Sequence, residues 1–198
     1  MESTELVNKQ ASVKITLLGK GMVGKSSLTY RFINYNAPEE HDPTIEDKFM
    51  TVVDIDGKAV SVNILDTAGQ DDYQGLIDMW VDSGEGFILV FALNDKESFI
   101  DLDKKKSKID VIKKKAKTPI ILVGNKCDLE NEREITRKEA EEKAKLWGAV
   151  YYETSAKTDI NCNEPFIECS KQIIKLTESK HGNVNEVKKD NGCCCIIY

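Results

Sequence analysis

The segment Gly19–Ser26 constrains the fold of this chain more than any other, because it has the spacing of a phosphate-binding loop. It reads Gly-Lys-Gly-Met-Val-Gly-Lys-Ser and follows the alternating apolar run Val13–Leu18. Glycines let the backbone turn tightly with its N–H groups facing anionic oxygens, and a helix beginning near Lys25 adds the positive end of its dipole. We expect Lys25 to reach the β- and γ-phosphates and the Ser26 hydroxyl to ligate Mg²⁺. The alternative is a plain glycine turn, but a strand before it and a helix after it favour a nucleotide site.

Length and composition limit the remaining possibilities. The 198 residues suit one domain with tails, which we place at residues 1–11 (a flexible extension), 12–178 (the globular domain) and 179–198 (a flexible tail). A net charge of −6 argues against nucleic-acid binding. No apolar run reaches the roughly 18 residues of a transmembrane helix, and the first residues lack the apolar core of a signal peptide. We therefore expect a cytosolic chain with reduced thiols.

Hydrophobic periodicity predicts alternating strands and helices. The predicted strands are Val13–Leu18, Phe49–Ile55, Lys58–Leu65, Phe87–Leu93, Ile120–Gly124 and Val150–Thr154. The predicted helices are Lys25–Ile33, Lys96–Lys117, Thr136–Trp147 and Glu164–Glu178. Asp56-Gly57 marks a hairpin between the second and third strands, and Thr136 with Glu139 forms a capping box. This alternation predicts an α/β fold, a mostly parallel sheet with helices on both faces and ligands at the carboxyl ends of its strands.

A lysine-rich stretch lies within the second predicted helix. Eight lysines fall between Lys104 and Lys117, and aspartates interleave with them. We interpret this stretch as a solvated helix face rather than a binding patch.

A second motif, Asp66-Thr67-Ala68-Gly69-Gln70, follows the third strand. In a phosphate-loop protein an Asp at a strand end holds Mg²⁺, directly or through water. Gly69 can bring its N–H close to a γ-phosphate, and Gln70 can orient the attacking water. Alone the segment would be an ordinary turn, but its position about forty residues after the phosphate loop favours the functional interpretation.

Two further motifs indicate guanine. In Asn125-Lys126-Cys127-Asp128, the Asp128 carboxylate can accept hydrogen bonds from guanine N1–H and the 2-amino group, a pair of donors that adenine lacks. Asn125 would bond the base or tie loops together, and the Lys126 stem would cover the base plane. In Thr154-Ser155-Ala156-Lys157, the Ala156 N–H can donate to the guanine carbonyl. Each short motif alone is compatible with an ordinary loop; the four together, in this order, are not.

The four motifs together resemble those of the Ras subfamily of small GTPases, over roughly Val13–Leu176. Asp42–Asp47 resembles the Ras effector segment, and Gly84–Phe87 and Glu153–Lys157 are also Ras-like. No extra helical insert follows Asp128, which argues against the Rho group. The resemblance implies the P-loop GTPase G domain, with a six-stranded, mostly parallel sheet and five flanking helices. It also implies a signalling switch that hydrolyses GTP and is active when GTP-bound.

The resemblance also implies the site residues and their roles. Thr44 would close on Mg²⁺ and the γ-phosphate, and residues 70–80 would form the second switch. The predicted catalytic residues are Gln70, Lys25 and Thr44, and the predicted Mg²⁺ ligands are Ser26, Thr44 and Asp66. The residues predicted to bind GTP or GDP are Gly19, Gly21, Met22, Val23, Gly24, Lys25, Ser26, Ser27, Thr44, Asp66, Gly69, Asn125, Lys126, Asp128, Ser155, Ala156 and Lys157. The predicted effector contacts are Asp42, Pro43, Thr44, Ile45, Glu46 and Asp47.

The expected partners follow from the same resemblance. No arginine is an obvious catalytic finger in cis, so we expect a GTPase-activating protein to supply one. A guanine nucleotide exchange factor and effectors with a Ras-binding domain complete the set, and the chain itself is expected to be a monomer. A side chain at Gly21 would crowd Gln70 and the incoming arginine.

The sequence departs from the Ras pattern at three positions. Ala37 stands where Ras proteins carry a Phe that packs edge-on against guanine, so we expect faster nucleotide release unless nearby Tyr35 substitutes. Met22 replaces a small residue in the phosphate loop, and His41 replaces a Tyr before the effector segment. The alternative functions are a GTP-binding scaffold with fast exchange and irrelevant hydrolysis, and a nucleotide kinase. Asn125–Asp128 argues against the kinase.

The last residues indicate lipidation. Cys195-Ile-Ile-Tyr has the shape of a prenylation box, and the bulk of the terminal Tyr198 favours geranylgeranyl. Cys193 or Cys194 is a candidate for palmitoylation, the second signal that stable anchoring needs. We therefore expect the protein at the cytoplasmic face of a membrane, most simply the plasma membrane. An unmodified tail is the alternative.

Overall fold

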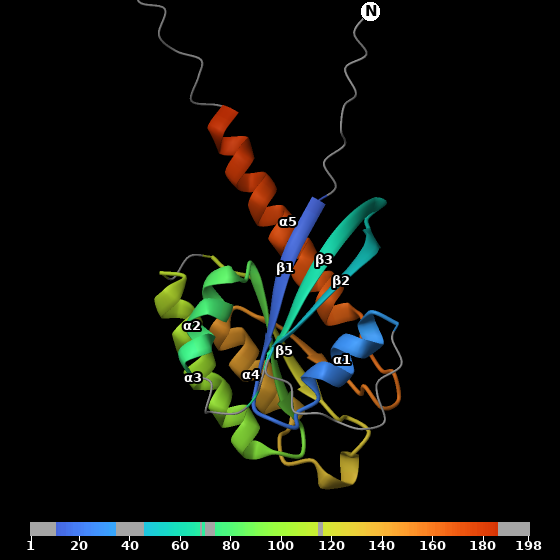
Figure 1. Cartoon of the computed structure of the whole chain (residues 1–198). Coiled ribbons are helices and arrows are strands. Elements are labelled where there is room, and N and C mark those ends of the chain that lie inside the picture. The colour runs from blue at the N-terminus through green and yellow to red at the C-terminus, as the bar shows by residue number, and fades with distance from the viewer. Residues whose placement is uncertain (1–10, 35–45, 68, 70–73, 115–116, 186–198) are drawn as a thin grey trace, which may run out of the picture.

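The structure, a computed structural model, describes residues 11–34, 46–67, 69, 74–114 and 117–185 (Figure 1). Within them the chain forms one six-stranded sheet in the order β2-β3-β1-β4-β5-β6. The strands are β1 (Ala11–Leu18), β2 (Glu46–Ile55), β3 (Lys58–Thr67), β4 (Gly86–Ala92), β5 (Ile120–Asn125) and β6 (Val150–Glu153). Only the β2–β3 hairpin is antiparallel in this sheet. The predicted fold class is confirmed.

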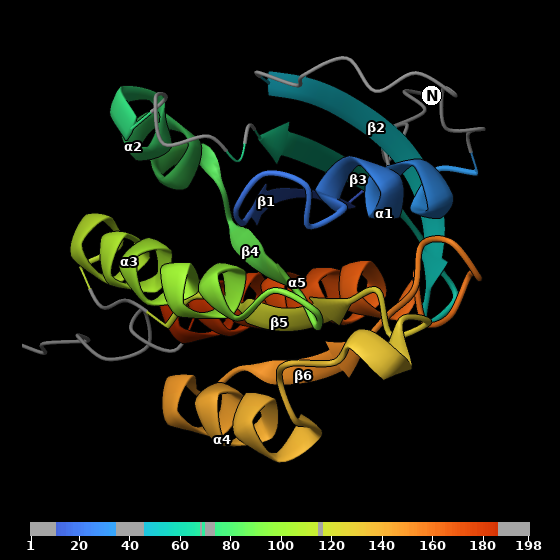
Figure 2. The same cartoon turned by 90° about the horizontal axis from the view of Figure 1, so that it is seen from below.

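Helices cover both faces of the sheet (Figure 2). They are α1 (Lys25–Phe32), α2 (Gln74–Ser83), α3 (Lys96–Ile112), α4 (Arg137–Trp147) and α5 (Glu164–Asn185), with a short 3₁₀ turn η2 (Glu130–Glu132). One core cluster contains Leu28 and Phe32 of α1 with Phe166 of α5, so these two helices share one face. The other cluster contains Trp80 of α2, Leu102 of α3 and Ala140 of α4, so these three share the opposite face.

Strands β4 and β5 are buried parallel strands in the interior of the sheet. Every residue of β4 and β5 is buried, as expected for strands covered on both faces. Their apolar runs therefore carry no alternation, and their boundaries come from the turns around them. The carboxyl ends of β1, β3, β4 and β5 lie at one edge, since these strands run parallel to one another. The loops that leave this edge carry the predicted motifs.

Most predicted boundaries agree with the structure to within a few residues, and three findings differ. Helix α3 ends at Ile112 rather than Lys117, because Lys114 has a positive φ of 52° that stops the helical turn. Helix α5 continues to Asn185, beyond the predicted Glu178. Strand β2 begins at Glu46, three residues earlier than predicted, so Glu46 and Asp47 pair with β3 rather than lying in a loop.

Helix α2 was not located from periodicity, although the resemblance implied a fifth helix. Its apolar residues Leu76, Ile77, Trp80 and Val81 do follow helical spacing and pack into the second core cluster. By contrast the capping box was predicted correctly: the Thr136 hydroxyl accepts from the Glu139 N–H at 3.3 Å, and Glu139 accepts from the Thr136 N–H at 2.8 Å.

The interpretation of the lysine-rich stretch as a solvated face is wrong for Lys105. Its side chain is buried in α3 and pairs with Asp101, one turn earlier, at 2.7 Å. Lys106 pairs with Asp110 at 2.6 Å, and Lys108 reaches Asp78 of α2 at 2.7 Å. These lysines therefore form ion pairs within α3 and between α3 and α2, in addition to exposing charge to solvent. Within the described residues no helix combines the length and the apolar character needed to cross a bilayer.

Candidate functional site

The loop between β1 and α1 folds back over its own lysine. The Lys25 ammonium donates to the carbonyls of Gly19 at 3.2 Å and Lys20 at 3.1 Å, and the residue is only 6% exposed. Burial lowers the pKa of Lys25 to about 8, and the nearby Asp66 carboxylate opposes that shift. The loop thus holds a desolvated cation at the end of β1, which is the arrangement that an anionic phosphate would complete.

Three glycines permit backbone approaches that no other residue could make. A Cβ on Gly19 would overlap the carbonyl of Val90, and one on Gly69 would overlap the peptide between Lys20 and Gly21. Gly24 has a φ of 94°, and a Cβ there would overlap the side-chain amide of Asn125. Gly69 is also bonded to the loop, because its carbonyl accepts from Gly21 N–H at 2.9 Å. The phosphate loop and the second motif are therefore in direct contact.

The residues predicted to hold Mg²⁺ present the donors that this ion prefers. Ser26 is a buried residue in the first turn of α1, and Asp66, near the end of β3, is fully buried. A hydroxyl and a carboxylate are hard oxygen ligands suited to Mg²⁺, which is commonly held by one or two protein groups plus phosphates. No cluster of three or more His, Cys, Asp or Glu side chains that would suit another metal is found in the described part of the chain. The donor set therefore fits Mg²⁺, with Thr44 outside the described residues.

Asn125, at the end of β5, joins three loops. Its Nδ2 donates to the Val23 carbonyl at 2.9 Å, and its Oδ1 accepts from the Thr154 hydroxyl at 3.1 Å and the Ala156 N–H at 3.3 Å. The side chain is 2% exposed. Asn125 thus ties the phosphate loop to the two predicted base-binding loops, one of the two roles left open by the sequence. The Ala156 N–H, predicted to donate to guanine, makes a long bond to Asn125 in this structure.

The two base-binding loops also contact each other directly. The Ser155 hydroxyl donates to Asp128 Oδ1 at 2.6 Å, and Ser155 itself is fully buried. This bond orients the Asp128 carboxylate, which remains partly exposed at the site. Arg31 of α1 reaches the same region, where its Nε donates to the Ala156 carbonyl at 2.8 Å. Lys126, with a positive φ of 66°, and the exposed Lys157 complete these loops.

Several predicted site residues lie outside the described residues. They are Gln70, Thr44, Asp42, Pro43, Ile45, Ala37, His41, Tyr35, Cys193, Cys194 and Cys195. The predicted site residues that the structure does describe gather at one edge of the sheet. They come from the phosphate loop and the adjoining Ser27, from the second motif (Asp66 and Gly69) and from the two base-binding loops. Glu46 and Asp47, the two described residues of the predicted effector segment, begin the edge strand β2, where they pair with Thr67 and Asp66 of β3.

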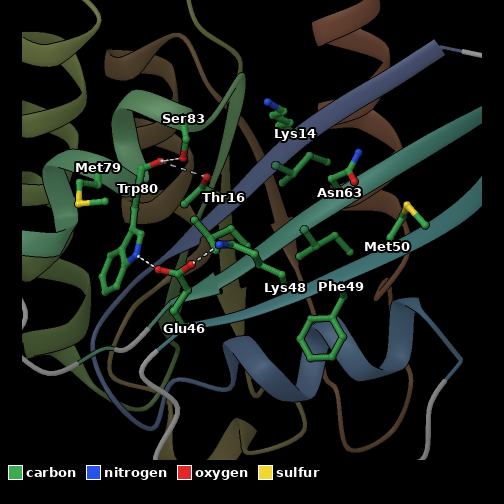
Figure 3. Close-up of a pocket in the computed structure, with 13 residues that line it drawn as sticks. Lys14, Thr16, Glu46, Lys48, Phe49, Met50, Asn63, Met79, Trp80 and Ser83 are labelled. Atoms are coloured by element: carbon green, nitrogen blue, oxygen red, sulfur yellow. Dashed lines mark hydrogen bonds and ion pairs between the residues drawn. The ribbon is translucent and has the colours of Figure 1, made fainter.

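A cavity lies beside β2, the strand that begins with the predicted effector residues Glu46 and Asp47, and nothing in the sequence indicated it. It has a volume of about 470 Å³ and lies between α2, β1, β2 and β3 (Figure 3). At one end the Trp80 indole N–H donates to Glu46 Oε2 at 2.7 Å, and Lys48 pairs with Glu46 Oε1 at 2.7 Å. Lys48 and then Trp80 lower the pKa of Glu46. The sequence gives no sign that Glu46, in the predicted effector segment, bonds a tryptophan 34 residues away.

The substitution at Met22 has a backbone consequence that the sequence did not reveal. Met22 has a φ of 65°, in the left-handed region, and its side chain is 84% exposed. A residue with a Cβ pays roughly 1–2 kcal/mol in this conformation, whereas glycine does not. The phosphate loop therefore stores strain at Met22.

Comparisons with known proteins agree with these motifs. A family model described as the Ras family matches residues 14–175. The Ras-like protein rasB of Dictyostelium discoideum is 40% identical over 191 residues, covering 93% of this chain and 96% of that protein. The Ras-related protein R-Ras of Mus musculus is 38% identical over 187 residues, covering 93% of this chain and 86% of that protein. The Ras-related protein O-RAL of Diplobatis ommata is 38% identical over 191 residues, covering 93% of each.

The strain at Met22 leads to a stability prediction. Met22→Gly should stabilise the fold by about 0.5–1 kcal/mol, because relief of ~1–2 kcal/mol of strain exceeds the ~0.5–1 kcal/mol entropic cost of glycine. Urea unfolding at a constant m value measures the difference. Met79→Gly is the matched control: Met79 is also exposed but lies in α2, so glycine there should destabilise by about 1 kcal/mol. A less stable Met22→Gly variant would contradict the strain argument.

Proposed function

This chain belongs to the Ras family of small GTPases, and we propose that it is a Mg²⁺-dependent GTP switch that signals to effectors at a membrane. The observation that carries the proposal is the Asn125 side chain, which joins the phosphate loop to both base-binding loops. A site that holds phosphates and a base needs these loops in one fixed arrangement. The members of the family bind guanine nucleotides and hydrolyse GTP, and the proposal assigns those roles to residues of this chain.

Base selection is assigned to Asp128. Its carboxylate would accept from N1–H and the 2-amino group of guanine, while the Ser155 hydroxyl holds it in place. Adenine offers an acceptor at N1 where guanine offers a donor, so it would face the carboxylate with like charge and lose both bonds. The Ala156 N–H would donate to the guanine carbonyl by sharing or leaving its long bond to Asn125.

Phosphate binding is assigned to the loop and its lysine. The Lys25 ammonium, already desolvated against the Gly19 and Lys20 carbonyls, would turn its remaining N–H toward the β- and γ-phosphates. The Ser26 hydroxyl and Asp66 would hold Mg²⁺, which when bound neutralises charge on the phosphate oxygens. The Gly69 N–H would donate to the γ-phosphate, so that this segment senses whether GTP or GDP is present.

Hydrolysis is assigned to positioning rather than to covalent chemistry. Gln70 would orient the attacking water, and Thr44 would close over the γ-phosphate. The chain has three arginines, and each is engaged elsewhere: Arg31 with Ala156, Arg133 with Glu153 and Arg137 with Glu141. This arrangement supports an arginine supplied in trans by a GTPase-activating protein. An exchange factor and Ras-binding-domain effectors are the other proposed partners.

The alternative, a GTP-binding scaffold with fast exchange, rests on Ala37. That residue lies outside the described residues, so faster release stays a prediction from the sequence. The Asn125, Asp128 and Ser155 contacts support guanine binding in either case, and Gln70 and Thr44 favour the switch over the scaffold.

Base recognition can be tested at Asp128. Asp128→Ala should weaken GTP binding roughly 10–150-fold, the range for hydrogen bonds to a charged group worth about 1.5–3 kcal/mol. Competition between labelled GTP and unlabelled ATP would show the preference for guanine falling by a similar factor. Asp82→Ala, which removes an exposed carboxylate at the end of α2, should bind GTP as wild type does. Unchanged GTP affinity in Asp128→Ala would refute the assignment.

Stimulated hydrolysis can be tested at Gly21 and Gln70. Among the described residues, a Cβ at Gly21 would come within 4 Å of the Gly69 carbonyl alone, at 3.9 Å, so this part of the loop accommodates a side chain. We therefore expect Gly21→Val and Gln70→Leu to bind GTP normally but to lose the acceleration of ~10³–10⁵ that a trans arginine supplies. Single-turnover GTP hydrolysis, with and without a GTPase-activating protein, measures this. Normal stimulated turnover in either variant would exclude these roles.

Membrane anchoring can be tested on the tail. We propose that Cys195 is prenylated and that Cys193 or Cys194 is palmitoylated, which together give stable attachment to the plasma membrane. Mass spectrometry of the native carboxyl terminus should show a prenyl mass on Cys195. Cys195→Ser should move the protein from the membrane to the soluble fraction. An intact tail ending in an unmodified Tyr198 would exclude prenylation.

A further inference from the structure

Lys20 is the one residue of the described phosphate loop whose charged side chain forms ion pairs with another element. Its Nζ lies 2.8 Å from Glu97 Oε2 and 3.7 Å from Asp95 Oδ2. Both acids belong to the start of α3, 75 and more positions away in the sequence. Two carboxylates therefore converge on one ammonium group, and the contact spans two elements that no main-chain ladder joins.

The ion pairs of Lys20 with Asp95 and Glu97 form a tether between the phosphate loop and α3. The acidic end of this tether is fixed in the fold. Asp95 is the N-cap of α3, and its Oδ1 accepts from the Ser98 N–H at 3.1 Å while its Oδ2 faces Lys20. The Ser98 hydroxyl donates to the Asp95 carbonyl at 2.7 Å and accepts from the Ala92 N–H of β4 at 3.1 Å. The start of α3 is thus locked to the end of a fully buried strand, so it can serve as an anchor.

The loop end of the tether lies at the peptide that organises the site. The Lys20 carbonyl accepts from the Lys25 ammonium at 3.1 Å. The next residue, Gly21, donates its N–H to the Gly69 carbonyl at 2.9 Å, and the peptide between Lys20 and Gly21 packs directly on Gly69. A shift of the Lys20 backbone would therefore displace both the partner of Lys25 and the contact with Gly69.

We propose that Lys20 is a positioning residue for the nucleotide, holding the phosphate loop against α3 through Glu97 and Asp95 and so slowing nucleotide release. The inference rests on the proposed function, because it concerns how tightly that site keeps its ligand. The tether acts on the loop backbone without touching the ligand. It also offsets part of the negative charge of Asp95 and Glu97 near the place where phosphates would bind.

The expected effect is modest, because the pair is partly solvated. The side chain of Lys20 is 39% exposed, that of Asp95 36% and that of Glu97 85%, and exposed ion pairs contribute little. The convergence of two acids, one of them fixed as a helix cap, raises the effect above that of a single mobile pair. We expect a two- to five-fold change in the release rate, and we expect it to shrink at high salt.

The test is release of labelled GDP from the full-length protein in the presence of Mg²⁺. Lys20→Ala should release GDP two- to five-fold faster at low salt, and Lys20→Arg should restore the wild-type rate. Glu97→Ala should accelerate release less, since Asp95 remains, and the Lys20→Ala/Glu97→Ala double variant should be no faster than Lys20→Ala. Lys138→Ala is the matched control, because it removes an exposed lysine of α4 that faces Glu142 at 3.9 Å, away from the loop.

The outcomes separate this inference from the proposed function. Wild-type release from Lys20→Ala overturns the tether, and so does a double variant in which the two effects simply add. The tether is also overturned if Lys138→Ala accelerates GDP release as much as Lys20→Ala does, because the effect would then come from the loss of any positive charge. A wild-type protein that binds no GDP would overturn the proposed function itself, whereas normal GDP binding with an unchanged Lys20→Ala rate overturns only the role of Lys20.

Discussion

The burial of one ammonium group, that of Lys25, sets the conditions for the rest of the site. A desolvated cation is unstable unless acceptors surround it, and here the Gly19 and Lys20 carbonyls and the charge of Asp66 do so. Carbonyls can turn inward only where the backbone curls, so the loop needs Gly19 and Gly24 at close approaches. The parallel strands bring β1 and β3 to the same edge and so place Asp66 near Lys25. The Lys25 ammonium therefore lies at the edge of the sheet where the predicted phosphate-binding residues gather.

Asn125 extends this local arrangement to the whole site. Phosphate recognition and base recognition depend on loops that follow different strands, and each loop alone would be free to move. Because one buried side chain bonds the Val23 carbonyl, the Thr154 hydroxyl and the Ala156 N–H, it couples the positions of these loops. We therefore expect a substitution in the predicted base-binding loops to affect the phosphate loop as well, so that substitutions in the two regions would not have additive effects.

The sequence predicted the backbone frame, and which motifs meet at one edge of the sheet, for a physical reason. Motifs such as Gly24-Lys25-Ser26 and Asn125–Asp128 are local, and strands and helices follow local periodicity, so order along the chain was enough to place them at one edge of the sheet. The sequence did not predict contacts between side chains that lie far apart along the chain. Trp80 with Glu46 and Lys20 with Glu97 depend on how α2 and α3 pack, which periodicity does not encode. The positive φ of Met22 was missed because an exposed methionine gives no sign of backbone strain.

The long-range contacts fall into two groups: those that hold the phosphate loop, and the one that joins α2 to β2. Asn125 connects the phosphate loop to the loop that follows β6, and Lys20 connects it to the start of α3, whose Ser98 is bonded to the buried strand β4. The Trp80–Glu46 hydrogen bond differs, because it joins α2 to the edge strand β2, which pairs with only one neighbour in the described sheet. An indole N–H bonded to a carboxylate at 2.7 Å is charge-assisted and strong enough to make the two elements move as one. A displacement of either α2 or the start of β2 is therefore transmitted to the other.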